Sequence, residues 1–144
     1  MAGVDVEYFM MDDHQETNSR IAELLSSKGK LDKNTVQEID SMLRRHIFIE
    51  EAILFPEFSP EMYNDMEYLE REHGDVFMVL DSMANQMDEE KIRKSLKDLL
   101  TILLEHNSYE ESFIYNFFSK KDAALLEAVK AAPENWKCRF ADQG

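Results

Sequence analysis

A chain of 144 residues is long enough to bury one substantial hydrophobic core and is most simply a single domain. Its formal net charge of −14 argues against nucleic acid and acidic lipid surfaces as partners, because binding their phosphates needs lysine and arginine. The sequence has no apolar run of about 18 residues, which excludes a membrane-spanning helix. The N-terminal stretch MAGVDVEYFMMDD lacks the basic and apolar parts of a secretion signal, and the single cysteine cannot form an internal disulfide. We therefore expect a cytoplasmic protein.

Glycine and proline are few, and they divide the chain into helices. A first helix ends before the glycine-containing turn at 26–32, SSKGKLD, where Asp32 is placed to cap the second helix. The second helix ends at FPEFSPE (55–61), and Ser59 with Pro60 marks the start of the third. The boundary between the third and fourth helices lies near 88–90, where no glycine or proline marks it.

In each helix, side chains spaced by three and four residues form a stripe that is expected to face the neighbouring helices. The four stripes are Met11, His14, Asn18, Ile21 and Leu25; Val36, Ile39, Leu43, His46, Glu50 and Ile53; Met62, Met66, Leu69, His73, Val76, Leu80, Met83 and Met87; and Leu96, Leu99, Leu103, His106, Glu110, Phe113 and Phe117. This pattern predicts an all-α, antiparallel up-down-up-down four-helix bundle. A short C-terminal helix over 121–132 completes the predicted domain, 1–132, and residues 133–144, with Trp136 and Cys138, form a tail.

All four histidines lie on these inward stripes, together with two glutamates. The motif HIFIEEAILFP (46–56) places a histidine and a glutamate four residues apart, on one face of a helix, and HNSYEESFIYNFF repeats that spacing sixty residues later. Measured from the turns of an antiparallel bundle, the six side chains lie at heights that differ by only a few ångströms. The predicted metal ligands are His14, His46, Glu50, His73, His106 and Glu110.

Six such groups at one level indicate a metal centre, although a single inward histidine is usually a hydrogen-bonded core residue. Burying two unpaired carboxylates costs on the order of several kcal/mol each, and divalent cations offset that cost directly. Two imidazoles for each metal and two shared carboxylates suit a pair of metals. The mixed nitrogen and oxygen donors favour iron, with manganese or zinc as competitors. A structural zinc site is less suitable, because the ligands number six and no thiolate approaches.

The ordered set of motifs resembles the hemerythrin-like, His-His-Glu cation-binding family. The resemblance is carried by DDH at 12–14, HIFIEEAILFP at 46–56, EREH at 70–73 and HNSYEE at 106–111, and it covers about residues 10–120. It implies a four-helix bundle around two non-haem iron ions that are oxo- or hydroxo-bridged. These ions are expected to bind O2 or a related diatomic molecule such as NO.

Two positions depart from the oxygen-carrying hemerythrins. Those proteins have a second histidine four residues after the third-helix ligand, where this chain has Phe77, and an aspartate where it has Glu111. We prefer Glu110 as the ligand because it repeats the spacing of the second helix, and we expect Glu111 to face sideways. Phe77 leaves both metals under-coordinated, which argues against simple reversible oxygen carriage. Glu70, which is otherwise a surface acid, is a candidate to fill the gap.

Other polar residues stand beside the ligands. Asp13, Glu51 and Glu72 are candidates to accept a hydrogen bond from an imidazole N–H, and surface charge is the alternative explanation for each. Asn18 is placed either to hydrogen-bond a bound ligand or water, or to make a polar contact at the end of the bundle. The sequence identifies no catalytic acid, nucleophile or substrate pocket.

The leading interpretation is a di-iron protein that binds or senses O2 or NO, a sensor acting through a separate protein partner. The alternative is iron storage or donation, or the repair of iron centres damaged by oxidation or nitric oxide, which the phenylalanine at position 77 favours. A ferritin-like oxidase needs two Glu-x-x-His motifs, and this chain has only Glu70–His73. A plain interaction bundle is disfavoured by the buried charges.

Overall fold

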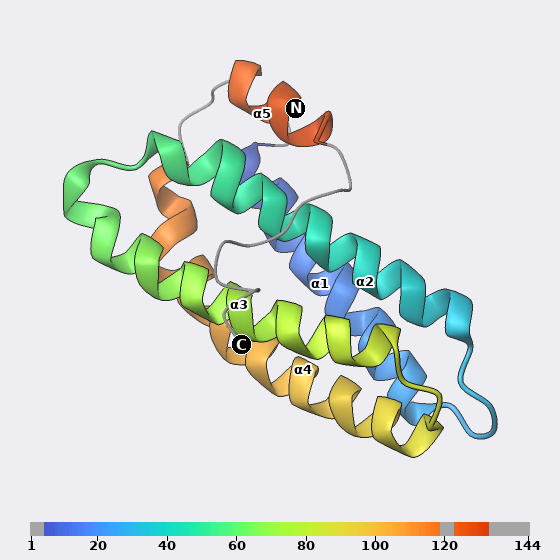
Figure 1. Ribbon diagram of the computed structural model, residues 1–144. Coiled ribbons are helices and arrows are strands. Elements are labelled where there is room, and N and C mark those ends of the chain that lie inside the picture. The colour runs from blue at the N-terminus through green and yellow to red at the C-terminus, as the bar shows by residue number, and fades with distance from the viewer. Residues whose placement is uncertain (1–4, 119–122, 133–144) are drawn as a thin grey trace.

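The protein is a bundle of four long antiparallel helices (Figure 1). The structure is a computed structural model that describes residues 5–118 and 123–132. Consecutive helices pack side by side, and the fourth packs back against the first. The helices are α1 (Val6–Ser26), α2 (Lys33–Phe48), α3 (Tyr63–Ala84), α4 (Glu89–Tyr109) and the short α5 (Ala123–Lys130). No strand occurs in the described ranges, so the predicted all-α bundle is confirmed. None of the described helices has the length and apolar character needed to cross a membrane.

Aspartate side chains begin three of the four long helices. Asp32 accepts a hydrogen bond from the Asn34 N–H (3.0 Å), as predicted, and Asp5 caps α1 in the same way. Asp88 caps α4 and marks the boundary that no glycine or proline indicated. Before α3 the chain makes two 3₁₀ turns, η2 (Phe55–Glu57) and η3 (Pro60–Met62), and Ser59 precedes the second of them without capping it through its side chain.

Both long helices of the His-x-x-x-Glu motifs end in a π-helical segment instead of continuing as α-helix. These segments are η1 (Ile49–Leu54), after α2, and η4 (Glu110–Ile114), after α4. A further 3₁₀ turn, η5 (Tyr115–Phe118), follows η4. Single π turns inside α-helices are frequent at functional sites, and the wider turn changes which residues face inward.

The predicted inward stripes are wrong at four positions, which are exposed to solvent by 39 to 79%: Met11, Met87, Phe113 and Phe117. In the fourth helix the cause is η4, which advances the inward face by one residue and buries Ile114, Tyr115 and Phe118 instead. In the first helix the buried methionine is Met10, and Met87 lies beyond the end of α3.

The apolar core consists of two clusters. One fills the end of the bundle near the α1–α2 turn and includes Ile21, Leu43, Val76 and Leu99. The other fills the opposite end around η1 and η4. Between them lie the buried histidines and glutamates, so that apolar side chains close off a polar layer from both ends.

Helix α5 lies across the outside of the bundle, against η1 and α1 (Figure 1). The guanidinium of Arg45 donates hydrogen bonds to the carbonyl oxygens of Lys130 (2.8 Å) and Ala132 (3.1 Å). These bonds give partners to carbonyl groups at the C-terminal end of this short helix, which have none within the helix itself. The predicted helix over 121–132 is thus present as Ala123–Lys130. Residues 121 and 122 of that prediction, and the tail with Trp136 and Cys138, lie outside the described residues.

Candidate metal centre

Four imidazoles meet in pairs at the centre of the bundle. The Nε2 atoms of His14 on α1 and His46 on α2 lie 3.0 Å apart. The Nε2 atoms of His73 on α3 and His106 on α4 lie 3.1 Å apart. All four rings are buried, so each pair forms a nitrogen-lined position shielded from solvent.

Two fully buried carboxylates lie between the imidazole pairs. Glu50 contributes an oxygen 2.9 Å from His73 Nε2, and Glu110 contributes one 3.1 Å from His14 Nε2. The six predicted residues thereby form two donor groups whose ligand atoms lie within 4.8 Å of one another: His14, His46, Glu50 and Glu110, and Glu50, His73, His106 and Glu110. Because both carboxylates belong to both groups, they are placed to bridge two cations. We call these six residues the ligand layer.

The ligand layer is surrounded by four more carboxylates, which we call the supporting carboxylates. Each accepts a hydrogen bond from the Nδ1 atom of a histidine on the next helix, and the fourth closes the ring from η4 to α1. The pairs are Asp13–His46, Glu51–His73 and Glu72–His106, each at 2.7 Å, and Glu111–His14 at 2.8 Å. The expected role of Asp13, Glu51 and Glu72 as acceptors is therefore the one that the geometry supports, and Glu111 faces sideways from the layer.

These outer hydrogen bonds determine which nitrogen of each imidazole faces the centre. With Nδ1–H donating outward, the Nε2 lone pair points into the ligand layer, as in most metal-binding histidines. Two lone pairs about 3 Å apart repel each other unless a cation lies between them.

The two central carboxylates, Glu50 and Glu110, likewise lack a neighbouring positive charge when the imidazoles are neutral. Glu50 Oε1 and Glu110 Oε2 have no hydrogen-bond partner within the described ranges, although both residues are fully buried. The nearest groups are the nitrogens His73 Nε2 and His106 Nε2, which are acceptors once Nδ1 carries the proton. A metal cation satisfies both kinds of orphaned group, so the residues present fit the metal pair that the sequence predicts.

Without a metal, protons supply the missing charge. Burial by itself disfavours an imidazolium, but the carboxylates of Glu50 and Asp13 outweigh it and raise the pKa of His46 well above its usual value. Burial opposes charge at His106 too, yet Glu110 above all raises its pKa to about 10. The pKa of His73 is also raised, by Glu50 and Glu51 against the effect of burial. The layer thus attracts positive charge strongly.

Tyr115 is a member of the site that the α-helical pattern did not reveal. Its hydroxyl lies 2.5 Å from Glu50 Oε2 and 2.9 Å from His14 Nε2, and the ring is fully buried. Burial and the two nearby carboxylates hold the pKa of this phenol well above its usual value. An α-helix would place Ile114 above Glu110, and only the π turn of η4 brings the fifth residue there. An aromatic hydroxyl five residues after the glutamate is the clue in the sequence.

A small cavity adjoins the ligand layer on the side of the α1–α2 turn. Its volume is about 10 Å³ in positions open to a water molecule, and its walls include the side chains of Thr17, Asn18, Leu43, Ile47, Val76, Leu103 and Asn107. The Asn18 Oδ1 atom is buried and has no hydrogen-bond partner among the residues described. Of the two explanations for Asn18, the geometry therefore favours a contact to a bound water or small ligand.

Two residues singled out in the sequence lie away from the donor groups. The Phe77 ring is fully buried, and the Arg44 guanidinium lies 5.0 Å from its centroid, so this side chain belongs to the packing between α2 and α3. Val76, not Phe77, lines the cavity. Glu70 is buried but is in neither donor group of the described residues.

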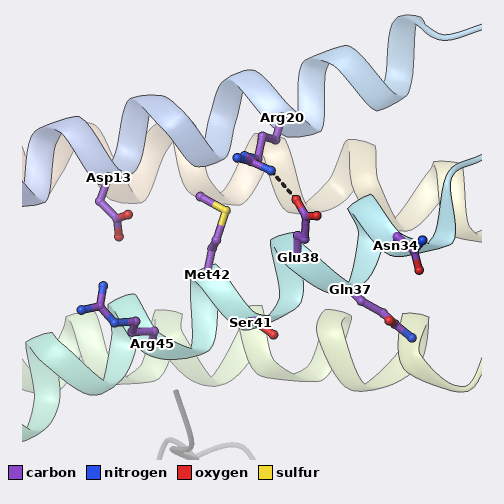
Figure 2. A pocket seen from close by; sticks show the side chains of 8 residues that line it. All are labelled: Asp13, Arg20, Asn34, Gln37, Glu38, Ser41, Met42 and Arg45. Carbon is purple, nitrogen blue, oxygen red and sulfur yellow. Dashed lines mark hydrogen bonds and ion pairs between the residues drawn. The ribbon is translucent and has the colours of Figure 1, made fainter. Parts of the chain in front are cut away.

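A surface groove between α1 and α2 touches the site at one point only (Figure 2). Asp13 lies at one end of it, and an ion pair between Arg20 and Glu38 spans it. Most of the polar groups that line it are half-exposed or exposed, so this groove does not compete with the buried layer as a metal site.

A family model described as the hemerythrin HHE cation binding domain matches residues 5–118. The matched range contains the ligand layer, the supporting carboxylates and Tyr115. No curated protein and no solved structure matches the chain.

Proposed function

Because the chain belongs to the hemerythrin HHE cation-binding domain family, we propose that its ligand layer holds two non-haem iron ions that bind or sense O2 or NO. One observation carries the proposal. Two buried carboxylates with unsatisfied oxygens lie between two pairs of imidazoles whose lone pairs converge. Neutral imidazoles leave these atoms unpaired, and a pair of divalent cations satisfies them together.

The donor set assigns ligands to each ion. His14 and His46 would hold one, His73 and His106 would hold the other, and Glu50 and Glu110, which belong to both groups, would be shared between them. Imidazole and carboxylate donors suit iron, and an oxo or hydroxo group would complete the bridge. Bound iron supplies the capacity to bind a diatomic molecule and exchange electrons with it.

The cavity supports a small ligand. At about 10 Å³ it accommodates one water-sized group, which excludes an organic substrate from this side of the layer. Its walls are mostly apolar, so they keep bulk water away, while the amide of Asn18 offers a polar contact. This arrangement favours O2 or NO over larger molecules.

Iron storage or donation, or the repair of damaged iron centres, is the second candidate. The position of Phe77 favours it, because the side chain packs under Arg44 and supplies no fifth imidazole. Each ion then has only two nitrogen ligands, and weaker retention of iron suits a donor better than a carrier.

The first experiment is anaerobic loading with excess Fe(II), followed by desalting and elemental analysis. We expect two iron ions per chain, and a value of one or none would contradict the proposal. Visible spectra after addition of O2 or NO, followed by removal of the gas, then test the reversible binding expected of a carrier or sensor. Rapid transfer of iron to a weak chelator, without a reversible gas-bound spectrum, would instead identify iron handling.

A further inference from the structure

The Tyr115 hydroxyl lies inside one of the two donor groups, and we propose that it binds the metal held by His14 and His46 as a phenolate. The inference rests on the proposed function, because it requires metal in the ligand layer. It adds a third type of ligand to the imidazoles and carboxylates, and it makes the two metal positions chemically different.

The distances place this oxygen within the coordination space of one metal. Tyr115 Oη lies 2.5 Å from Glu50 Oε2 and 3.1 Å from Glu110 Oε1. It lies 2.9 Å from His14 Nε2 and 3.3 Å from His46 Nε2. These four atoms come from the four members of the first donor group. An oxygen in contact with every member of a donor set is placed to join that set.

Without metal, this buried hydroxyl lies among four groups that can accept a hydrogen bond. It has one hydrogen to donate, which goes to Glu50, while the other neighbours are a carboxylate and two imidazole nitrogens. When metal binds, an oxygen–metal bond replaces the O–H bond, and the proton leaves to solvent. The step needs no oxidant, and the charge of two divalent cations exceeds that of two carboxylates and one phenolate.

The other half of the site has the same backbone arrangement but no hydroxyl. The N–H of Phe55 donates to the carbonyl of Glu50, five residues earlier, as the N–H of Tyr115 does to that of Glu110. The Phe55 ring stacks on His73 with centroids 5.9 Å apart and planes 6° apart. The metal at His73 and His106 therefore receives no phenolate and has more coordination positions open to a small ligand.

The test uses the full chain loaded anaerobically with Fe(II) and then oxidised to Fe(III) with ferricyanide. A ferric phenolate has a charge-transfer band in the visible and enhanced phenolate vibrations in the resonance Raman spectrum. The wild type is compared with Tyr115→Phe and with the matched control Tyr109→Phe. Tyr109 lies on α4 outside both donor groups, and its hydroxyl bonds to Asp65.

We expect the phenolate spectrum in the wild type and in Tyr109→Phe, and its complete loss in Tyr115→Phe. Iron binding without this spectrum in the wild type, or its persistence in Tyr115→Phe, would overturn the inference while leaving the proposed function intact. Failure of the wild type to bind iron would overturn both. If Tyr115→Phe does not fold, ring-deuterated tyrosine in the wild type decides, because Tyr115 is the tyrosine whose hydroxyl contacts all four members of a donor group.

Discussion

Glu72 on α3 and His106 on α4 lie 2.7 Å apart, carboxylate oxygen to Nδ1, and Glu72 stands next to His73, itself a predicted ligand. The same adjacency recurs at one predicted ligand in each of the other three helical segments: Asp13 precedes His14, Glu51 follows Glu50 and Glu111 follows Glu110. Neighbouring residues on a helix point in different directions. One turn of backbone therefore supplies a ligand to the centre and an acceptor to the histidine of an adjacent helix.

Removing one supporting carboxylate should weaken metal binding without removing a ligand. Glu72→Gln keeps the shape of the side chain but loses the charge that orients His106 and makes it more basic. We expect a loss of about 10- to 100-fold in metal affinity, measured by competition with a chelator. Glu67→Gln is the matched control, because Glu67 is an exposed acid on the same helix, paired with Arg71. Equal affinities of the two variants would show that the outer hydrogen bond does not support the metal.

The two central carboxylates should each be needed for full metal content. We expect Glu50→Ala and Glu110→Ala each to lose at least one iron per chain and to lower the melting temperature of the loaded protein. The reason is that each carboxylate belongs to both donor groups. Glu57→Ala, at an exposed acid in η2, serves as the control. A variant that retained two irons by elemental analysis would show that its carboxylate is not a bridge.

The cavity beside the ligand layer should control access of small ligands to the metals. Val76→Ile adds one methylene to the wall of a space of only about 10 Å³. We expect azide to bind the diferric protein roughly 10-fold more weakly or worse, with iron content unchanged. Val79→Ile makes the same change at a partly buried position that does not line the cavity. Spectroscopic titration with azide measures both, and unaltered affinity in Val76→Ile would exclude this route.

Metal loading at neutral pH should release protons. In the metal-free protein the pKa of His106 is about 10, so this ring is protonated at pH 7, and the pKa values of His46 and His73 are raised in the same direction. A metal ion takes the place of those protons, which means that its affinity falls as the pH is lowered. Calorimetry with Zn(II) in buffers of different ionisation enthalpy measures the number released. A heat of binding independent of the buffer would contradict this description of the metal-free site.

The six ligands could be predicted from the sequence because their positions depend on two regular quantities. Four-residue spacing puts His46 with Glu50, and equal distance from a turn puts His14 level with His46. Both quantities predict side-chain positions as long as the helices stay regular. The structure brings the six side chains together, and their binding of metal remains a prediction.

The rest of the site depends on the places where the helices stop being regular. An α-helical pattern puts Phe113 inward, whereas η4 turns it to solvent and brings Tyr115 over Glu110. No residue of that segment is a glycine or proline that would indicate the wider turn. The partners of the supporting carboxylates were likewise out of reach, because Glu111 bonds to a histidine 97 residues away in the chain.

The spacing of the ligand layer repeats once along the chain. His14 and His73 are 59 residues apart, and 60 residues separate His46 from His106 and Glu50 from Glu110. Each helical hairpin thus resembles one subunit of a twofold dimer, with the two subunits joined in a single polypeptide. Each hairpin contributes one pair of imidazoles and one glutamate that reaches the imidazole pair of the other hairpin. Two ions held in the ligand layer would therefore be coupled at the seam between the hairpins. Opening that seam would take the other hairpin's carboxylate from both ions in the same event, so we expect the two ions to dissociate together.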